Sequence, residues 1–219
     1  MDRILEPEIM DGEAEAAAYA SADFSDSNQA YVDDVVASFP QRLAKVVDLG
    51  CGPGDIALRL SRAAANTRIT GVDASPAMLA IARAALRSAG LEGRVSFLEG
   101  RIPGVALPDG GFDLVLSKDM LHHLPDPQVL WSEVQRLGRP GAGVCVMDLC
   151  RPSTPAAAHA IVERVSRDEH PLLKSDFYNS LCAAFTAEEV RAQLAAAGLS
   201  LAVSQLTERH LCVKGRLPG

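Results

Sequence analysis

Three glycines and an aspartate in the first half of the chain are the residues best suited to bind a ligand. The segment Val46–Gly54 has the pattern of an apolar strand that runs into Gly50, Gly52 and Gly54 and then into a helix. Such a turn lets the backbone approach a ligand closely at the end of a strand. Asp73 ends the next apolar run, where its carboxylate can accept hydrogen bonds from both hydroxyls of a ribose. Together the two segments predict a nucleoside-binding site.

The glycine spacing indicates which nucleoside is bound. A dinucleotide-binding turn needs G-x-G-x-x-G, whose third glycine permits close packing of the helix on the strand while the pyrophosphate rests on the helix N-terminus. Asp55 occupies the position of that third glycine. A carboxylate in the first helical turn repels a pyrophosphate but tolerates a cationic ligand. We therefore expect a ligand without phosphates, and a nicotinamide-dependent oxidoreductase is the less favoured alternative.

Further motifs stand at predicted strand ends or helix starts along the chain. With the glycine turn they are Val46-Val47-Asp48-Leu49-Gly50-Cys51-Gly52-Pro53-Gly54, Gly71-Val72-Asp73-Ala74-Ser75, Gly111-Phe112-Asp113-Leu114-Val115, Leu121-His122-His123-Leu124, Arg139-Pro140-Gly141-Ala142-Gly143 and Phe185-Thr186-Ala187-Glu188-Glu189-Val190. In order and spacing, over about residues 40 to 215, the set resembles the class I S-adenosylmethionine-dependent methyltransferases, of the type 11 and type 25 groups that act on small molecules. The resemblance implies S-adenosylmethionine as the cofactor and S-adenosylhomocysteine as the product, and it leaves the methyl acceptor open.

Strand and helix patterns alternate between about residues 44 and 150, which predicts an α/β fold with a mostly parallel sheet and helices on both faces. Strands are expected over residues 43–49, 68–73, 94–99, 112–117 and 143–149, and an antiparallel C-terminal hairpin over residues 200–207 and 210–214. The resemblance implies that this hairpin completes a Rossmann-like, seven-stranded mixed sheet.

Two segments fall outside the sheet pattern and are predicted to form a small helical lid. Residues 1–40 are expected to be an N-terminal helical lid segment, and residues 41–219 a methyltransferase domain with a lid insertion at about 151–182. In open α/β sheets, ligands lie beyond the carboxyl ends of the strands, so insertions at that edge face the substrate. We expect these two segments to determine substrate identity.

The resemblance assigns the cofactor to residues at the carboxyl ends of the strands. Asp48 would contact its methionine end, Asp73 its ribose, and Ala74 and Met78 its adenine. Asp73 is also placed to cap the helix that starts after Ser75, and Met78 is equally suited to core packing. The predicted cofactor-binding set is Asp48, Gly50, Cys51, Gly52, Asp73, Ala74, Met78, Gly100, Arg101, Ile102, Ser117 and Lys118.

The chain departs from the family pattern after the third strand. Similar sequences have Gly-Asp there, with the aspartate accepting a hydrogen bond from the adenine amino group, whereas this chain has Gly100-Arg101. Arginine cannot accept a hydrogen bond. Either a backbone carbonyl near Arg101 or Ile102 replaces the carboxylate, or apolar packing holds adenine. This departure leaves open the alternative that the chain is a non-catalytic regulatory protein that binds S-adenosylmethionine.

Two histidines and an aspartate are the candidate catalytic residues. His122 and His123 follow the predicted fourth strand, where the loop of similar enzymes faces the transferred methyl group, and Asp148 lies near the end of the fifth. A histidine oriented by a carboxylate can take a proton from a hydroxyl as it attacks. His122 is the first choice of base. The alternative is that both histidines pack against or cap the helix near residues 125–127.

The two lid segments contain side chains suited to hold the methyl acceptor. Aromatic, amide and basic groups orient small ligands in enclosed sites. The predicted substrate-binding residues are Tyr19, Phe24, Arg151, Tyr178 and Asn179. The five cysteines include no C-x-x-C pair, so no metal site is predicted.

Composition and charge narrow the possible partners. The 21 basic and 28 acidic residues give the 219-residue chain a net charge of -7, which disfavours binding to nucleic acid. No apolar run reaches the roughly eighteen residues of a membrane span, and the N-terminal residues lack the apolar core of a signal peptide. Scattered cysteines, odd in number, suit a reducing compartment. We expect a cytoplasmic monomer or homodimer that acts on a small molecule without binding nucleic acid or membrane.

Overall fold

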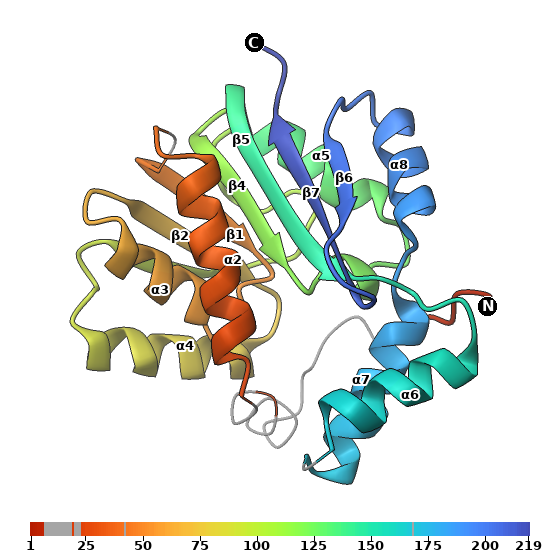
Figure 1. The fold of residues 1–219 in the computed structure, drawn as a ribbon. Coiled ribbons are helices and arrows are strands. Elements are labelled where there is room, and N and C mark those ends of the chain that lie inside the picture. Colours follow the sequence, from red (N-terminus) through yellow and green to blue (C-terminus); the bar gives the residue numbers. More distant parts are fainter. Residues whose placement is uncertain (7–18, 20–22, 42, 168) are drawn as a thin grey trace.

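A seven-stranded sheet in the order β3-β2-β1-β4-β5-β7-β6 forms the centre of the computed structural model, which describes residues 1–6, 19, 23–41, 43–167 and 169–219 (Figure 1). From β3 to β5 neighbouring strands are parallel, whereas β7 runs antiparallel to both β5 and β6. Chain order reverses between β1 and β4, and ligands of such sheets bind beyond the carboxyl ends of the strands at this point. The strands are β1 Lys45–Leu49, β2 Arg68–Asp73, β3 Val95–Glu99, β4 Phe112–Lys118, β5 Gly138–Leu149, β6 Ala202–Gln205 and β7 His210–Arg216.

Helices cover both faces of the sheet (Figure 1), which confirms the predicted Rossmann-like architecture. Alternate residues of β1 show the two layers: Val46 packs with α2, α3 and α4, and Val47 packs with α5 and α8. This alternation follows from the two-residue repeat of a strand. The helices are α2 Ser25–Ser38, α3 Asp55–Ala63, α4 Pro76–Ala89, α5 Gln128–Leu137, α6 Pro155–Val165, α7 Pro171–Ala183 and α8 Ala187–Ala196, with a short 3-10 helix, η1 Leu121–His123.

Local sequence explains several helix ends. The Ser75 hydroxyl accepts a hydrogen bond from the Met78 amide at 3.2 Å, and Pro76 occupies the first turn of α4. At α8, Thr186 and Glu189 form a reciprocal capping box. Within the described part of the chain, no helix is long and apolar enough to cross a membrane.

Strand β5 is longer than predicted. The glycine- and proline-rich turn before residue 143 favoured a loop, but pairing of Phe112 with Gly138 starts β5 five residues earlier, and the register shifts between Phe112 and Leu114. This irregularity accommodates the extra residues, as a β-bulge does.

The burial of α2 shows that the core of the domain begins before the predicted boundary at residue 40. Helix α2 is an integral layer of the fold, because Tyr31, Val35 and Phe39 are almost fully buried against the sheet. The Tyr31 hydroxyl donates to the Cys145 carbonyl at 2.8 Å, which ties α2 to the middle of β5. Helix α2 is thus part of the core of the domain, whereas residues 7–18 and 20–22 of the predicted lid segment lie outside the described residues.

The predicted insertion consists of α6 and α7, which stand beyond the carboxyl ends of the strands (Figure 1). A small apolar cluster of its own, including Leu149, Ile161, Val162 and Leu181, joins the two helices to the end of β5. This placement puts the helix pair beside the site where ligands of such sheets bind.

Candidate functional site

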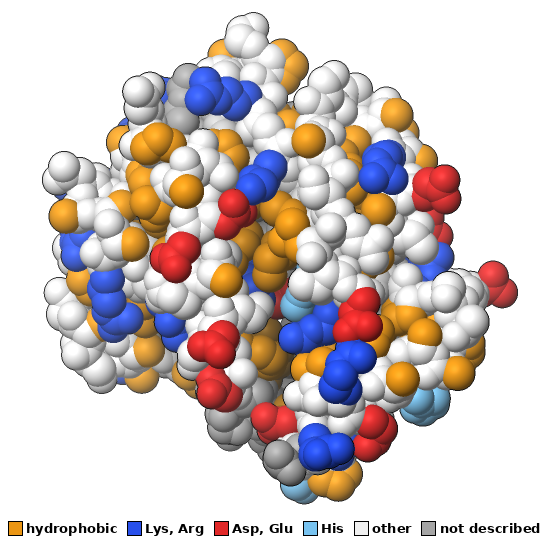
Figure 2. All heavy atoms as spheres, in the orientation of Figure 1, with side chains coloured by type: hydrophobic (Ala, Val, Ile, Leu, Met, Phe, Trp, Pro, Cys, Tyr) orange, Lys and Arg blue, Asp and Glu red, His pale blue; other side chains and the backbone are white. Residues whose placement is uncertain are grey.

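Two adjoining cavities lie at the carboxyl ends of the parallel strands. The first has a volume of about 420 Å³ and follows the glycine turn; the second, of about 340 Å³, lies between that turn and α7. In Figure 2 the surface is hollowed between α2 and the α6–α7 pair, with acidic side chains on the α2 side. In the part of the chain that the structure describes, five residues line both cavities and mark their junction: Tyr19, Phe24, Lys118, Asp119 and His123.

The glycine turn forms one wall of the first cavity. Gly50 has a positive φ of 72°, and a Cβ atom there would lie 2.7 Å from the side chain of Met120, so packing as well as conformation requires glycine. Gly52 has a φ of 50°, but a Cβ atom there would meet no described atom within 4 Å. The space at Gly52 therefore allows a ligand to approach the backbone.

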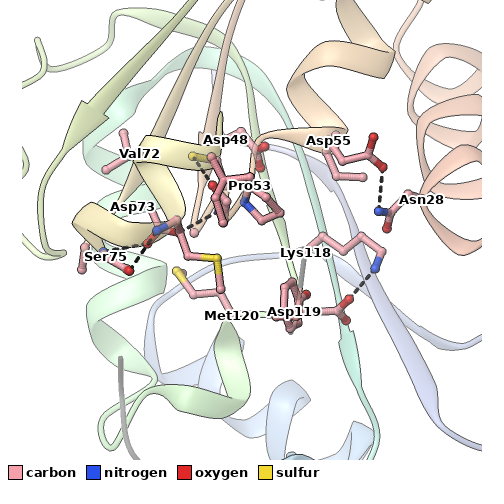
Figure 3. Close-up of a pocket in the computed structure, with 18 of the residues that line it drawn as sticks. Asn28, Asp48, Pro53, Asp55, Val72, Asp73, Ser75, Lys118, Asp119 and Met120 are labelled. Carbon is pink, nitrogen blue, oxygen red and sulfur yellow. Dashed lines mark hydrogen bonds and ion pairs between the residues drawn. The ribbon is translucent and has the colours of Figure 1, made fainter. Parts of the chain in front are cut away.

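Asp73 connects the end of β2 to this turn (Figure 3). Its Oδ2 accepts a hydrogen bond from the Gly52 amide at 2.7 Å, and its Oδ1 accepts one from the Ser75 amide at 2.8 Å. Burial raises the pKa of Asp73, although these amide donors oppose the shift. Each carboxylate oxygen has a second lone pair. Asp73 can thus hold the turn and still accept hydrogen bonds from a ligand.

Asp48 is a buried carboxylate without a full set of partners. Its side chain is almost fully buried near the carboxyl end of β1, and Oδ2 has no hydrogen-bond partner among the described residues. Burial and the nearby Asp73 raise the pKa of Asp48 to about 7, while Lys118 opposes the rise. A buried, unpaired carboxylate is costly. This one lines the first cavity, where it suits the cationic group of a ligand.

Most of the predicted cofactor-binding residues come together at the first cavity. Besides Asp48, Gly50, Gly52 and Asp73, its lining includes Cys51, Ala74, Met78, Gly100, Arg101, Ile102 and Lys118.

Ser117 is the exception in this set. It is fully buried and its hydroxyl donates to the Leu49 carbonyl at 2.9 Å, so it links β4 to β1 and lines neither cavity. Conversely, sequence reasoning missed Asn28, whose amide donates to Asp55 at 2.8 Å on the cavity wall (Figure 3). No local signal in α2 marks Asn28 as a ligand-facing residue.

The two histidines differ in environment. His122 is buried, and its Nδ1 lies 2.6 Å from Oδ1 of Asp148. The Leu149 amide donates to the same Oδ1, and the Leu121 amide donates to Oδ2. Burial alone would lower the pKa of His122, but Asp148 raises it above its usual value. Of the two cavities, His122 lines the second, whereas His123 lines both.

Glu6 lies against this histidine pair and was not found from the sequence. Its Oε1 is 3.4 Å from Nε2 of His122 and 3.3 Å from Nδ1 of His123. No spacing rule connects residue 6 with residue 122. The contact arises because the first residues of the chain run along the end of α7, a tertiary arrangement that local patterns do not encode.

The aromatic candidates Tyr19 and Phe24 line both cavities, with ring centroids 5.0 Å apart. Burial raises the pKa of the Tyr19 hydroxyl, and Asp119 adds to the rise. Both side chains are thus placed where ligands in the two cavities would meet.

Three predicted substrate-binding residues lie elsewhere. Arg151 donates to the carbonyls of Met1 and Ala184 and pairs with Glu189 at 2.5 Å, so it joins chain segments away from both cavities. Tyr178 stacks on His159 with ring centroids 4.1 Å apart, and Asn179 is exposed to solvent. The geometry does not support these three assignments. Helix α7 instead presents to the second cavity the i, i+3, i+4, i+7 set Leu173, Asp176, Phe177 and Ser180.

Among the described residues, two groups of side chains have donor atoms close enough together to hold a cation. They are Glu6 with His122 and His123, and Asp34 with Cys145 and Cys212. In the second group Lys214 already pairs with Asp34 at 2.7 Å. In the first, the histidines face carboxylates that balance their charge. We assign neither group to a metal.

Comparisons with known proteins identify the family. Residues 41–198 match the family described as "Methyltransferase domain". Demethylmenaquinone methyltransferase of Thermus thermophilus is 34% identical over 187 residues, covering 80% of this chain and 82% of the relative. For 27-O-demethylrifamycin SV methyltransferase of Amycolatopsis mediterranei the identity is 29%, covering 66% of this chain and 53% of the relative.

Solved structures share the fold. A S-adenosylmethionine-dependent methyltransferase from Aquifex aeolicus superposes with a TM-score of 0.72 at 19% identity, covering 94% of this chain and 98% of the other. Phosphoethanolamine N-methyltransferase 2 of Haemonchus contortus, in complex with S-adenosylmethionine, gives 0.73 at 15% identity over 95% of this chain and 58% of the other. The fold, the glycine turn with Asp73 and the family match agree: the chain belongs to the S-adenosylmethionine-dependent methyltransferases.

Proposed function

We propose that this protein transfers the methyl group of S-adenosylmethionine to an oxygen, nitrogen or carbon atom of a small molecule bound in the second cavity. The observation that carries the proposal is the junction of the two cavities, where His123 and two aromatic side chains line both. Methyl transfer requires the acceptor atom, the methyl carbon and the sulfur in line, with water excluded. Two adjoining cavities of these sizes can hold the two ligands in contact.

The first cavity fits the cofactor. Asp73 would accept hydrogen bonds from the ribose hydroxyls, and the unpartnered Oδ2 of Asp48 would face the cationic amino group. Ala74, Met78 and Ile102 would pack against adenine, with Arg101 on the same wall. When bound, S-adenosylmethionine supplies an electrophilic methyl group on a positively charged sulfur.

The chain's own residues would orient the acceptor and receive its proton. Tyr19 and Phe24 shield the junction from water, and the pair His122 and His123 supplies the base, with Asp148 orienting His122. A proton acceptor is needed when the attacking atom carries hydrogen.

The size and lining of the second cavity favour a small, largely apolar acceptor. Leu149, Leu173 and Phe177 contribute apolar side chains to its wall. The names of relatives that act on demethylmenaquinone and on a demethylrifamycin support the same class. The net charge of -7 favours such molecules over nucleic acid as the substrate. The scattered cysteines suit a cytoplasmic enzyme.

Cofactor affinity is expected to depend on pH through Asp48. Below pH 7 this carboxyl group is largely protonated in the free protein, because its pKa is raised to about 7, and a neutral carboxyl attracts an ammonium group weakly. S-adenosylhomocysteine should therefore bind about tenfold more weakly at pH 6 than at pH 8. Titration calorimetry measures this ratio. The Asp48→Asn variant should lose the dependence, and an equal slope in both proteins would assign it to another group.

A transfer assay tests the proposed function. The purified protein is incubated with methyl-labelled S-adenosylmethionine and a panel of phenols, hydroquinones, amines and carboxylic acids, and labelled organic product is measured. We expect label in at least one small product and none in added RNA. Tight binding of S-adenosylmethionine without transfer to any class would instead favour the non-catalytic binding protein.

A further inference from the structure

Hydrogen bonds hold the first six residues beside the histidine pair. The Arg3 guanidinium donates hydrogen bonds to the carbonyls of Ala183 at 2.5 Å, His122 at 2.8 Å and Leu124 at 2.9 Å, and it lies 3.8 Å from the centre of the Phe185 ring. The N-terminal segment is therefore bonded to η1, which carries the histidine pair, and to the end of α7.

These hydrogen bonds place the buried carboxylate of Glu6 beside the histidines. The Glu6 side chain is only 9% exposed; Oε2 accepts a hydrogen bond from the Ser180 hydroxyl at 3.2 Å, and Oε1 faces His122 Nε2 at 3.4 Å and His123 Nδ1 at 3.3 Å. Burial raises the pKa of Glu6, while His122 opposes the rise. A buried carboxylate oxygen is costly unless a donor or a cation faces it. Oε1 has no hydrogen-bond partner among the described residues, and the two imidazoles lie within ion-pair distance to compensate its charge.

The same contacts distinguish the roles of the two histidines. Both ring nitrogens of His122 face carboxylates, Asp148 at 2.6 Å and Glu6 at 3.4 Å, and the pKa of this imidazole is raised. With a carboxylate at each ring nitrogen, neither nitrogen of His122 is left to take a proton from an acceptor at the junction. His123 has Glu6 at its Nδ1 and lines the junction of both cavities. A carboxylate at Nδ1 of an imidazole is the arrangement that orients Nε2 toward the reacting atom in histidine-dependent enzymes.

We propose that Glu6 is a positioning residue of the active site, which holds His123 at the junction of the two cavities as the base for the acceptor. The inference rests on the proposed methyl transfer. His123 takes the proton of the acceptor as the bond to the methyl carbon forms and the sulfur–methyl bond breaks, leaving its electron pair on sulfur. His122, which the sequence favoured as the base, instead lies between Asp148 and Glu6, with a carboxylate at each ring nitrogen.

The proposal predicts a spectroscopic change that requires no acceptor. In the complex with S-adenosylhomocysteine, Glu6→Gln should lower the NMR titration midpoints of the His122 and His123 ring protons by about one pH unit, because an opposite charge at this distance is lost. The other charged and titratable groups around the pair, among the described residues, are unchanged in this variant: Arg3, Lys118, Asp119, Asp148, Glu169, Asp176, Arg209 and His210.

Two further variants separate this effect from general damage. Asp2→Asn removes the same charge from the same segment at an exposed position, and should leave both midpoints unchanged. Glu6→Asp keeps the charge on a shorter side chain, so its two midpoints should lie between those of Glu6→Gln and those of the wild type. Glutamine can still accept the hydrogen bond from Ser180, and the amide spectrum of residues 1–6 shows whether the segment stays in place. Unchanged midpoints in Glu6→Gln with the segment in place would overturn the proposal.

The enzymatic readout uses an acceptor found in the labelled-methyl panel. Glu6→Gln should lower kcat at least about tenfold with little change in KM for S-adenosylmethionine, and should move the acid limb of the kcat/KM profile to lower pH. If the wild-type protein transfers no methyl group, the proposed function fails while the titration still tests Glu6. If it transfers normally and Glu6→Gln matches Asp2→Asn in rate and profile, the inference about Glu6 fails alone.

Discussion

Replacing Asp73 by alanine is expected to weaken S-adenosylmethionine binding by at least about 100-fold. A carboxylate that accepts hydrogen bonds from two ribose hydroxyls loses two charge-assisted bonds, each worth about 1.5–3 kcal/mol, and about 1.4 kcal/mol corresponds to a tenfold change in affinity. Asp73 lines the first cavity at the end of β2, where such hydroxyls would lie. Titration calorimetry with S-adenosylmethionine and S-adenosylhomocysteine measures the loss.

A control is needed because Asp73 also accepts hydrogen bonds that hold the glycine turn in place. Alanine also frees the Gly52 and Ser75 amides, so part of the loss arises from the turn itself. Asp55→Asn removes a carboxylate charge from the same cavity wall and should change affinity by no more than about threefold, because Asp55 is bonded to Asn28 and Arg59. Unchanged affinity in Asp73→Ala would remove the ribose assignment. A fall in unfolding temperature alongside lost binding would assign the effect to the turn.

The parts of the fold and site that sequence predicted are those governed by local physics. Gly50, Gly52 and Gly54 follow a buried strand and all have positive φ, a conformation that side chains disfavour, so their spacing is visible in the sequence. Asp73 was found because it is the last residue of the strand predicted over residues 68–73, which is β2. Parallel strands place their carboxyl ends together, so these segments had to meet.

The rest depends on contacts between distant segments. Glu6 meets the histidines only because Arg3 is bonded to carbonyls of η1 and α7, and no periodicity marks such an arrangement. Arg151 was assigned to substrate because it is a basic residue of the predicted lid insertion, but Glu189 and two carbonyls hold it elsewhere. For α2 a signal existed: Tyr31, Val35 and Phe39 recur at helical spacing and mark the buried face that the boundary at residue 40 ignored.

The matched variants His123→Asn and His122→Asn are expected to differ by at least about 100-fold in kcat. Asparagine retains a donor near the position of Nδ1, so it can face Glu6 in the first variant and still bond to Asp148 in the second, but it lacks the Nε2 atom that accepts a proton. Removing a general base typically costs 10²- to 10⁴-fold. His123 lines both cavities, so its variant should lose that factor.

His122→Asn should retain most of the activity, because its imidazole lies buried between Asp148 and Glu6 and contributes charge balance rather than proton transfer. Both variants should bind S-adenosylhomocysteine like the wild type, which calorimetry verifies. The reverse order of rates would assign the base to His122 and Asp148, as the sequence alone suggested. Equal and small effects would mean that the acceptor loses its proton without a protein base, leaving alignment at the junction of the two cavities as the source of catalysis.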